Sequence, residues 1–523
     1  MNLSKQNSTL GYENSLPSLN HCARLEDSFT AGDFCKVAES KEHSWQKYAA
    51  LGLIGNSAKA IVGLQTFKED EAQFYLAVAH WMEGKEKKAI RLLRGINLPH
   101  AKNLLSLINK PTIRVLAQTE WFEKDFQDPK FSIQMAGLSK TKTSENGTLV
   151  VNVDTPKVAF EDILKSIAGQ PAPDFYFSNM IEWHLLPKNL QALPFPTFGV
   201  TSDFDLHIQN IHPWLPHFDE LITVGSEEWE KVRRLSGRPV SVFPKIFGLP
   251  EDLPPLKPTE RLVDLHISGT IANAYHPDKA LLLQQLLQHD AGHIRYVDGF
   301  TIYNDYIGQL EEAKTSFTYV RHGTSMPSRG LEALAMGCAV VTQKGSPLSI
   351  WASEENGVFT YNSIEELPAA LHKVKENWAE IAPGARRGAE IVRREFALSK
   401  CISQFLRYLT VLAAKPRPAR QPAPRENLHQ KRGVLQRGHC FASPTNLFML
   451  KHNAERWGDE NKRTSTPQHA INYGRELALF VAGDIVAAHR NVHSLQMDAA
   501  EKQATRNGLL EHREKLLRRV ELV

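Results

Sequence analysis

Cysteines, long apolar runs and net charge are all scarce in this sequence, and each scarcity limits the class of protein to which it can belong. The five cysteines in 523 residues include no C-x-x-C pair, which is typical of a reduced compartment and provides no zinc site. The most apolar run, "LALFVAGDIVAA", is short and interrupted by Gly483 and Asp484, and the polar amino terminus has no apolar signal core. We therefore expect a cytoplasmic protein without a transmembrane segment.

Net charge is also slight. The chain has 62 basic and 58 acidic residues, for a formal charge of +4, which is too little to favour a nucleic-acid partner. Its hydrophobic content of 42% and charged content of 23% are those of a soluble globular protein, and its length predicts two to four domains.

Residues 20–108 have apolar positions at helical spacing throughout. In "SWQKYAALGLIGNSAKAIVGL" and "AQFYLAVAHWMEGKEKKAIRLL", Gly55 and Gly84 each precede an alanine, Ala60 and Ala89, by five residues. A glycine permits a left-handed turn between helices, and an alanine lets the second helix pack closely on the first. The region resembles tetratricopeptide repeats, although its units are 29 residues apart instead of about 34. An irregular helical bundle is the alternative.

From 112 to 412, short apolar strands alternate with helices, which predicts parallel sheets covered on both faces. A proline-dense break at 243–262 divides the region into two doubly wound, Rossmann-like domains, 112–245 and 260–412, with a cleft between them. The predicted strands are IRVLAQ, TLVVNV, DFYFSN, PTFGVTSD, ELITVGS and VSVFP in the first domain, and LVDLHIS, IRYVDG, SFTYVR, AVVTQ and GVFTY in the second.

Two segments follow these domains. Residues 413–437 contain seven basic side chains, one acid and four prolines, which is typical of a solvated linker, although a basic patch for an anionic partner is an alternative. Residues 438–523 are predicted to be a helical segment that packs on the body or on a partner.

In an open parallel sheet, ligands bind at the carboxyl ends of strands. In "ISGTIANAYHPDK", Gly269 and Thr270 follow a strand, so their amides could approach a phosphate, with Lys279 further along. The alternative is that these residues form only a tight turn.

In "TYVRHGTSMPSRGLEALAMGCAVVTQ", a strand is predicted to end at Arg321 and a helix to begin at a Ser328 cap, with Gly337 at its left-handed end. Glu332 would then lie in the first turn, where its carboxylate can accept two hydroxyl hydrogen bonds, as from a ribose diol. The alternative is that Glu332 only complements the helix dipole.

The stretch "RGLEALAMGCAVVTQ", followed by "GVFTYNSIEELPAAL", closely resembles the donor-binding half of GT-B glycosyltransferases, especially the CgeB-like and group 1 transferases. The resemblance covers 112–412 in architecture and about 320–372 in motif. It implies that Glu332 binds the ribose of a nucleotide-diphosphate sugar, and that the closing helices cross back to the first domain. Many retaining members have a second glutamate eight positions earlier, where this chain has Thr324, so the stereochemical outcome stays open.

The remaining site residues are assigned by chemistry. Transfer requires cations or donors around the leaving diphosphate, polar groups near the sugar and, for inversion, a base for the acceptor. For the diphosphate we expect Arg321, Arg329 and Lys279, with the amides near Gly269. The loop amides after Gly323 and the hydroxyls of Thr324 and Ser325 can donate to sugar or phosphate. Arg329 could equally be a solvated residue at the start of the helix.

A base is expected from the first domain, where "VTSDFDLHIQ" places Asp205 and His207 after a strand. The segment "NMIEWHLLP" offers Glu182 and His184 as further candidates. The resemblance implies no bound metal, and no cofactor is expected beyond the nucleotide-sugar donor.

The leading hypothesis is transfer of a sugar from a nucleotide donor to a hydroxyl of a saccharide, lipid-linked or protein acceptor. The helical repeats could hold a protein partner, by analogy with transferases that modify polypeptides. Two alternatives are an inactive GT-B scaffold that binds partners through its repeats, and a nucleotide-sugar epimerase of similar fold.

Overall fold

The computed structural model describes residues 25–119, 128–137, 142–143, 149–152, 171–181, 190–202, 212–256, 260–268, 292–297, 303–320 and 324–417. It also describes residue 286 and scattered positions from 479 to 517, which are helical. Most of the predicted linker and of the carboxyl-terminal segment therefore lies outside the described residues. Within the described part, no helix has the length and the apolar run needed to cross a membrane.

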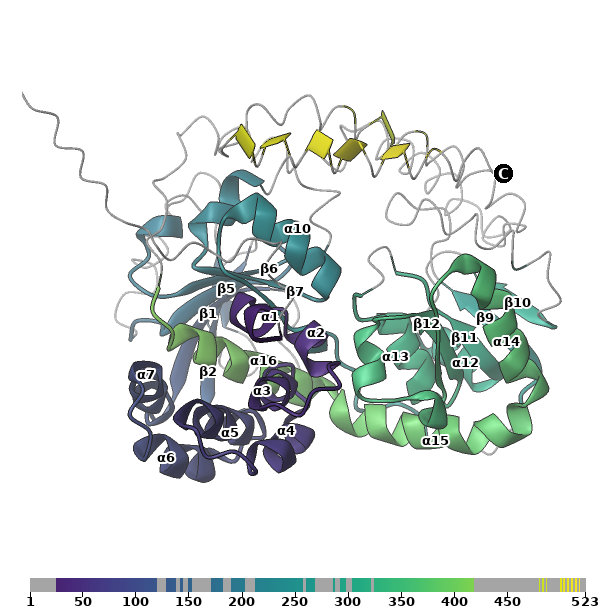
Figure 1. Cartoon of the computed structure of the whole chain (residues 1–523), viewed down its shortest axis with the longest axis horizontal. Helices are drawn as coiled ribbons and strands as arrows, with labels where there is room; N and C mark the ends of the chain where they lie inside the picture. The colour runs from purple at the N-terminus through teal and green to yellow at the C-terminus, as the bar shows by residue number, and fades with distance from the viewer. Residues whose placement is uncertain are drawn as a thin grey trace, which may run out of the picture.

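The amino-terminal region is helical, as predicted, and lies against the first sheet (Figure 1). The turns between the predicted helix pairs have the expected conformation, with φ of +88° at Gly55 and +70° at Gly84, and Ala60 and Ala89 are fully buried. The helices are α1 (Leu25–Ala31), α2 (Phe34–Ala38), α3 (Trp45–Leu53), α4 (Ser57–Leu64), α5 (Asp70–Met82), α6 (Glu86–Arg94) and α7 (Pro99–Ile108).

The first sheet has the strand order β3-β4-β2-β1-β5-β6-β7-β8, and every pairing is parallel except β3 with β4. Successive strands are added on one side of β1 up to β4 and on its other side from β5 onward, as in a doubly wound sheet. Helix α10 (Ser226–Ser236) joins the last two strands. The strands are β1 (Ile113–Gln118), β2 (Phe131–Gly137), β3 (Lys142–Thr143), β4 (Leu149–Asn152), β5 (Phe175–Ser178), β6 (Thr197–Val200), β7 (Glu220–Thr223) and β8 (Val240–Val242).

The second sheet is parallel throughout, in the order β10-β9-β11-β12-β13. Its strands are β9 (Val263–Ser268), β10 (Ile294–Val297), β11 (Ala313–Phe317), β12 (Ala339–Gln343) and β13 (Val358–Tyr361). Its described helices are α12 (Tyr303–Glu311), α13 (Ser328–Ala335) and α14 (Leu367–Glu376), followed by α15 (Trp378–Glu395).

The two doubly wound α/β domains with an amino-terminal helical region are confirmed, and each predicted strand overlaps an observed one. The sequence prediction missed β2 and β3. In "FSIQMAG", polar residues alternate with apolar ones, whereas most of the predicted strands are nearly continuous apolar runs, so the pattern of a half-covered strand was overlooked.

Helix α16 (Leu398–Ala413) returns from the second domain and lies between the amino-terminal helices and the first sheet (Figure 1). Phe405 packs edge-on against Phe177, with ring centroids 5.5 Å apart, and Tyr408 stacks on Phe243 at 4.8 Å. On the opposite side, the Trp81 indole donates to the carbonyl of Arg407. Both neighbours therefore share one continuous apolar core with α16.

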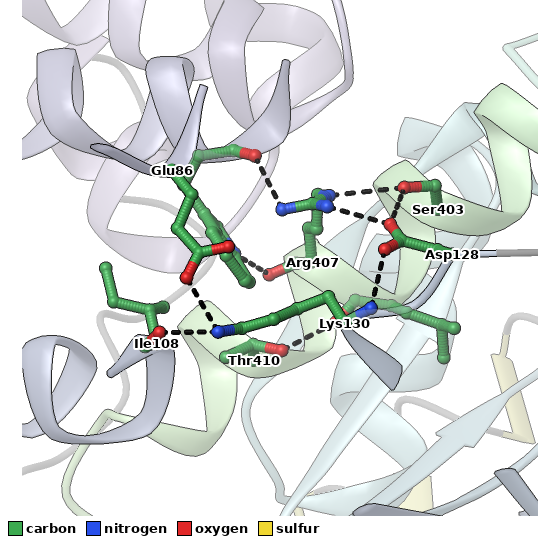
Figure 2. Close-up of polar contacts among 9 residues, drawn as sticks. Glu86, Ile108, Asp128, Lys130, Ser403, Arg407 and Thr410 are labelled. Atoms are coloured by element: carbon green, nitrogen blue, oxygen red, sulfur yellow. Dashed lines mark hydrogen bonds and ion pairs between the residues drawn. The ribbon is translucent and has the colours of Figure 1, made fainter. Parts of the chain in front are cut away.

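Figure 2 shows the polar network at this junction. The Arg407 guanidinium donates to the Asp128 carboxylate at 2.8 Å, lies over the Trp81 ring and is 7% exposed, while Ser403 donates to the same carboxylate at 2.6 Å. Burial by itself would raise the pKa of Asp128, but the hydrogen bond from Ser403 and the charge of Arg407 lower it overall. Nearby, Lys130 donates to Glu86 and to the carbonyls of Ile108 and Lys110.

We predict that Arg407→Ala lowers the free energy of unfolding by about 3–5 kcal/mol, because it leaves the Asp128 charge buried without its partner. The measurement is urea unfolding followed by tryptophan fluorescence, with the exposed Arg394→Ala as control. A depressed folded pKa stabilises the protein above the unfolded value of 3.8, so the difference between variant and wild type should shrink as the pH falls below 3.8. A loss no larger than that of Arg394→Ala would contradict the assignment.

Candidate functional site

The candidate site lies at the carboxyl ends of β9 and β11, where the order of the strands in the second sheet reverses. The chain leaves β9 toward β10 on one side and continues through β11 on the other, so β9 and β11 flank a topological switch point. Open α/β sheets bind their ligands at such a point, because the two loops there diverge and leave room. The loop after β11 leads into α13, which carries Glu332.

Helix α13 begins and ends close to the predicted positions, with two corrections. Pro327, not Ser328, is the N-cap, and the amide of Leu331 donates to its carbonyl. Glu332 therefore lies in the second turn, and β11 ends at Phe317 instead of Arg321. Gly337 has the predicted left-handed conformation, with φ of +78°.

The helix packs closely on the sheet at Gly330. A Cβ at Gly330 would be 2.9 Å from the Thr318 methyl group and 3.2 Å from Val340. The missing side chain thus lets the first turns of α13 lie against β11 and β12, which holds Glu332 beside the strand ends.

Glu332 is half-buried, and its burial raises the pKa of the carboxyl group, while the adjacent Tyr306 hydroxyl and the Arg329 charge act in the opposite direction. Arg329 is exposed one turn earlier on the same helix. Burial, followed by the nearby Glu332 charge, raises the pKa values of Tyr303 and Tyr306. The result is a carboxylate with one cation and two phenols around it, a set that can bind hydroxyl groups.

A buried histidine lies behind these tyrosines. His266 on β9 is fully buried, its Nε2 is 3.4 Å from Gln309 Oε1, and burial lowers its pKa to about 4, so the ring is neutral at pH 7. Its centroid is 5.9 Å from that of Tyr306. The sequence analysis missed Tyr303, Tyr306 and His266. The i, i+3 spacing of the tyrosines, just before "IGQLEEAK", was the available signal.

The loop after β11 carries hydroxyl groups with unused hydrogen-bonding capacity. Thr318 and Ser325 are 4% and 7% exposed, and neither hydroxyl has a hydrogen-bond partner among the described residues. Buried hydroxyls of this kind are normally satisfied by protein, water or ligand. Thr324 differs, since its hydroxyl accepts a hydrogen bond from the backbone amide of Glu227 in the first domain, at 2.7 Å.

The structure thus places Glu332, Arg329, Thr324 and Ser325 on one loop and helix. The other predicted site residues lie outside the described residues: Asp205, His207, Glu182, His184, Gly269, Thr270, Lys279, Arg321 and Gly323. Among the described residues, no three His, Cys, Asp or Glu side chains are grouped so as to hold a metal ion.

We predict that Glu332→Gln stabilises the protein at pH 7 by about 0.5–1 kcal/mol, because ionising this half-buried carboxyl costs more in the folded chain than in the unfolded one. An acid whose folded pKa is raised destabilises the fold above its unfolded value of 4.5. The gain in melting temperature should therefore be present at pH 7 and nearly absent at about pH 3, where both states are protonated. Scanning calorimetry at the two pH values measures it, with Glu376→Gln as the exposed control, and equal gains at both would contradict the expectation.

Comparison with known proteins shows which families and structures this part of the chain resembles. Residues 254–407 match the family described as "Glycosyl transferase-like", and no curated protein matches the chain. Solved structures similar to it include sucrose-phosphate synthase from Thermosynechococcus elongatus, at 12% identity and TM-score 0.39 over 58% of this chain and 100% of that one. A mutant O-GlcNAc transferase from Thermobaculum terrenum is similar at 12% identity and TM-score 0.40, over 77% of this chain and 97% of that one.

Anabaena HepE, solved in complex with UDP, is similar at 12% identity and TM-score 0.40, over 57% of this chain and 99% of that one. Similarities this weak carry no information on substrate. The family match and the two doubly wound sheets of this structure agree with each other. Residues 254–407 therefore resemble the glycosyl transferase-like family, and the described part of the chain has the two doubly wound α/β domains that the sequence predicts.

Proposed function

We propose that this protein transfers a sugar from a nucleotide-diphosphate donor to a hydroxyl group of an acceptor. The observation that carries the proposal is the placement of Glu332, a half-buried carboxylate at the switch point of a domain that matches a glycosyl transferase-like family. Acids whose pKa is shifted by burial and by specific neighbours cluster at functional sites.

The roles follow from charge and hydrogen-bonding capacity. The Glu332 carboxylate accepts two hydrogen bonds from the ribose diol, with the Tyr306 hydroxyl beside it. Arg329, together with the predicted Arg321 and Lys279, neutralises the diphosphate as the sugar leaves. The Ser325 hydroxyl, which has no hydrogen-bond partner among the described residues, donates to the sugar or to a phosphate oxygen.

The acceptor side is less constrained. Asp205 and His207 are proposed as the base that removes the acceptor proton, and the acceptor is a saccharide, a lipid-linked sugar or a protein. No metal ion is proposed, because the arginine and lysine side chains and the loop amides supply the positive charge that a diphosphate leaving group requires.

We predict that UDP-sugars or GDP-sugars bind this protein. Glu332→Ala should weaken binding by about 10- to 100-fold, which is the loss of affinity expected when the hydrogen bonds to one charged group are removed. Isothermal titration calorimetry measures the affinity, and Glu376→Ala, an exposed position at the end of α14, is the control. Absence of binding for every nucleotide sugar would overturn the proposal.

Product analysis separates the alternatives. Acceptor-dependent release of the nucleoside diphosphate indicates transfer, whereas conversion of the donor into a second nucleotide sugar indicates epimerisation. Donor binding that is lost in Glu332→Ala, with neither product formed, would fit an inactive scaffold that has kept its donor site.

A further inference from the structure

Thr324 occupies the position at which many related retaining enzymes have a second acid, and here its side chain contacts the other domain. Its Oγ1 accepts a hydrogen bond from the amide of Glu227, 2.7 Å away. Glu227 is in the first turn of α10, an 11-residue helix whose own N-cap, Gly225, has no side chain to satisfy the free amides. Thr324 therefore caps a helix that belongs to the first domain.

The backbones of the two domains also meet here. Ser325 and Gly225 form an isolated antiparallel bridge. A Cβ at Gly225 would be 2.4 Å from the carbonyl oxygen of Thr324 and 2.8 Å from the Cα of Ser325. Gly225 has an extended conformation, with φ of −157°, that any residue can adopt, so the glycine is required for the close approach and not for the turn.

The amino-terminal helices reinforce the same contact from outside. The hydroxyl of Ser226, next to Gly225, donates to Asp33, which caps α2. On the second domain, the side chains of Asn56 and Lys59 both donate to the carbonyl of Ile350, at 3.4 and 2.9 Å. The helical region thus contacts both sides of the junction between the domains.

We propose that Thr324 is a positioning residue for the reaction: its hydroxyl caps α10 across the domain junction and, with the Gly225 bridge, fixes the distance between the donor site and the first domain. This inference rests on the proposed function for its kinetic consequence only. Thr324 and Glu332, on α13 and the loop before it, then have two different roles. Glu332 binds the donor, and Thr324 brings the facing domain to it.

Three substitutions test the assignment. Thr324→Val keeps the shape of the side chain but removes the acceptor oxygen, and Thr324→Ser restores it. Gly225→Ala leaves the Thr324 and Ser325 hydroxyls in place and instead introduces a methyl group into the backbone bridge between Gly225 and Ser325. Gly95→Ala, at the end of α6, is the matched control, because its Cβ would make only one ordinary contact, at 3.5 Å with the Leu92 carbonyl.

The first readout needs no ligand. Hydrogen exchange at the Glu227 amide should be about tenfold faster in Thr324→Val than in wild type, the value of one hydrogen bond, and should return toward wild type in Thr324→Ser. Spin labels at Arg234→Cys on α10 and Glu376→Cys on α14, with Cys22 and Cys440 replaced by serine, should show a broader or longer distance distribution in Thr324→Val and Gly225→Ala. Cys35, Cys338 and Cys401 are buried.

The second readout is kinetic. Thr324→Val and Gly225→Ala should lower kcat/KM by about tenfold or more, because a misplaced first domain no longer aligns the acceptor with the donor sugar. Donor affinity measured by calorimetry should change little. A residue that contacts the donor directly would instead weaken the affinity.

Wild-type amide exchange and label distances in Thr324→Val would overturn the proposal, as would a Thr324→Ser protein that behaves like Thr324→Val. If no nucleotide sugar binds even the wild type, the proposed function fails, while exchange and distance still decide the role of Thr324.

Discussion

The arrangement of this molecule depends on the burial of helix α16. The chain leaves the first domain after β8, forms the whole second domain, and then returns α16 into the space between the amino-terminal helices and the first sheet. Side chains such as Phe405 and Tyr408 are almost fully buried there, and each contributes about 1.5–3 kcal/mol of transfer free energy. This helix connects three regions that are far apart in the sequence, so the position of the donor domain follows from where α16 is packed.

A buried lysine marks the same crossing. Lys245, directly after β8, is fully buried, and its ammonium group donates to Gln404 Oε1 at 2.6 Å and to the Gly55 carbonyl at 3.3 Å, beneath the Phe396 ring. Burial lowers the pKa of Lys245 to about 8. Because a buried charge must be satisfied, these contacts fix the register of α16 against the end of α3 and the segment after β8 more strictly than apolar packing alone.

The sequence predicted the parts of the fold that local patterns determine. Continuous apolar runs identified most of the strands, and the glycines at 55, 84 and 337 identified turns because only a left-handed residue fits there. It did not predict that Thr324 reaches the first domain, since that contact joins residues 97 apart in the chain. The start of α13 was also misplaced by one residue. Ser328 has a better capping side chain than Pro327, but the hydrogen bond that the Leu331 amide donates to the Pro327 carbonyl decides the boundary. The Tyr303, Tyr306 and His266 cluster depends on side-chain contacts between β9 and α12, which no single segment reveals.

The return of α16 also determines how late in its synthesis on the ribosome the chain can complete the first domain. The first sheet is complete in sequence at Val242, yet the face on which Phe405 and Tyr408 pack stays uncovered until Leu398–Ala413 has emerged. All strands of the second sheet are made in the interval. Until α16 has been made, Phe177 and Phe243 lack the Phe405 and Tyr408 rings that pack on them in the folded protein, and transiently exposed apolar surface of this kind favours misfolding.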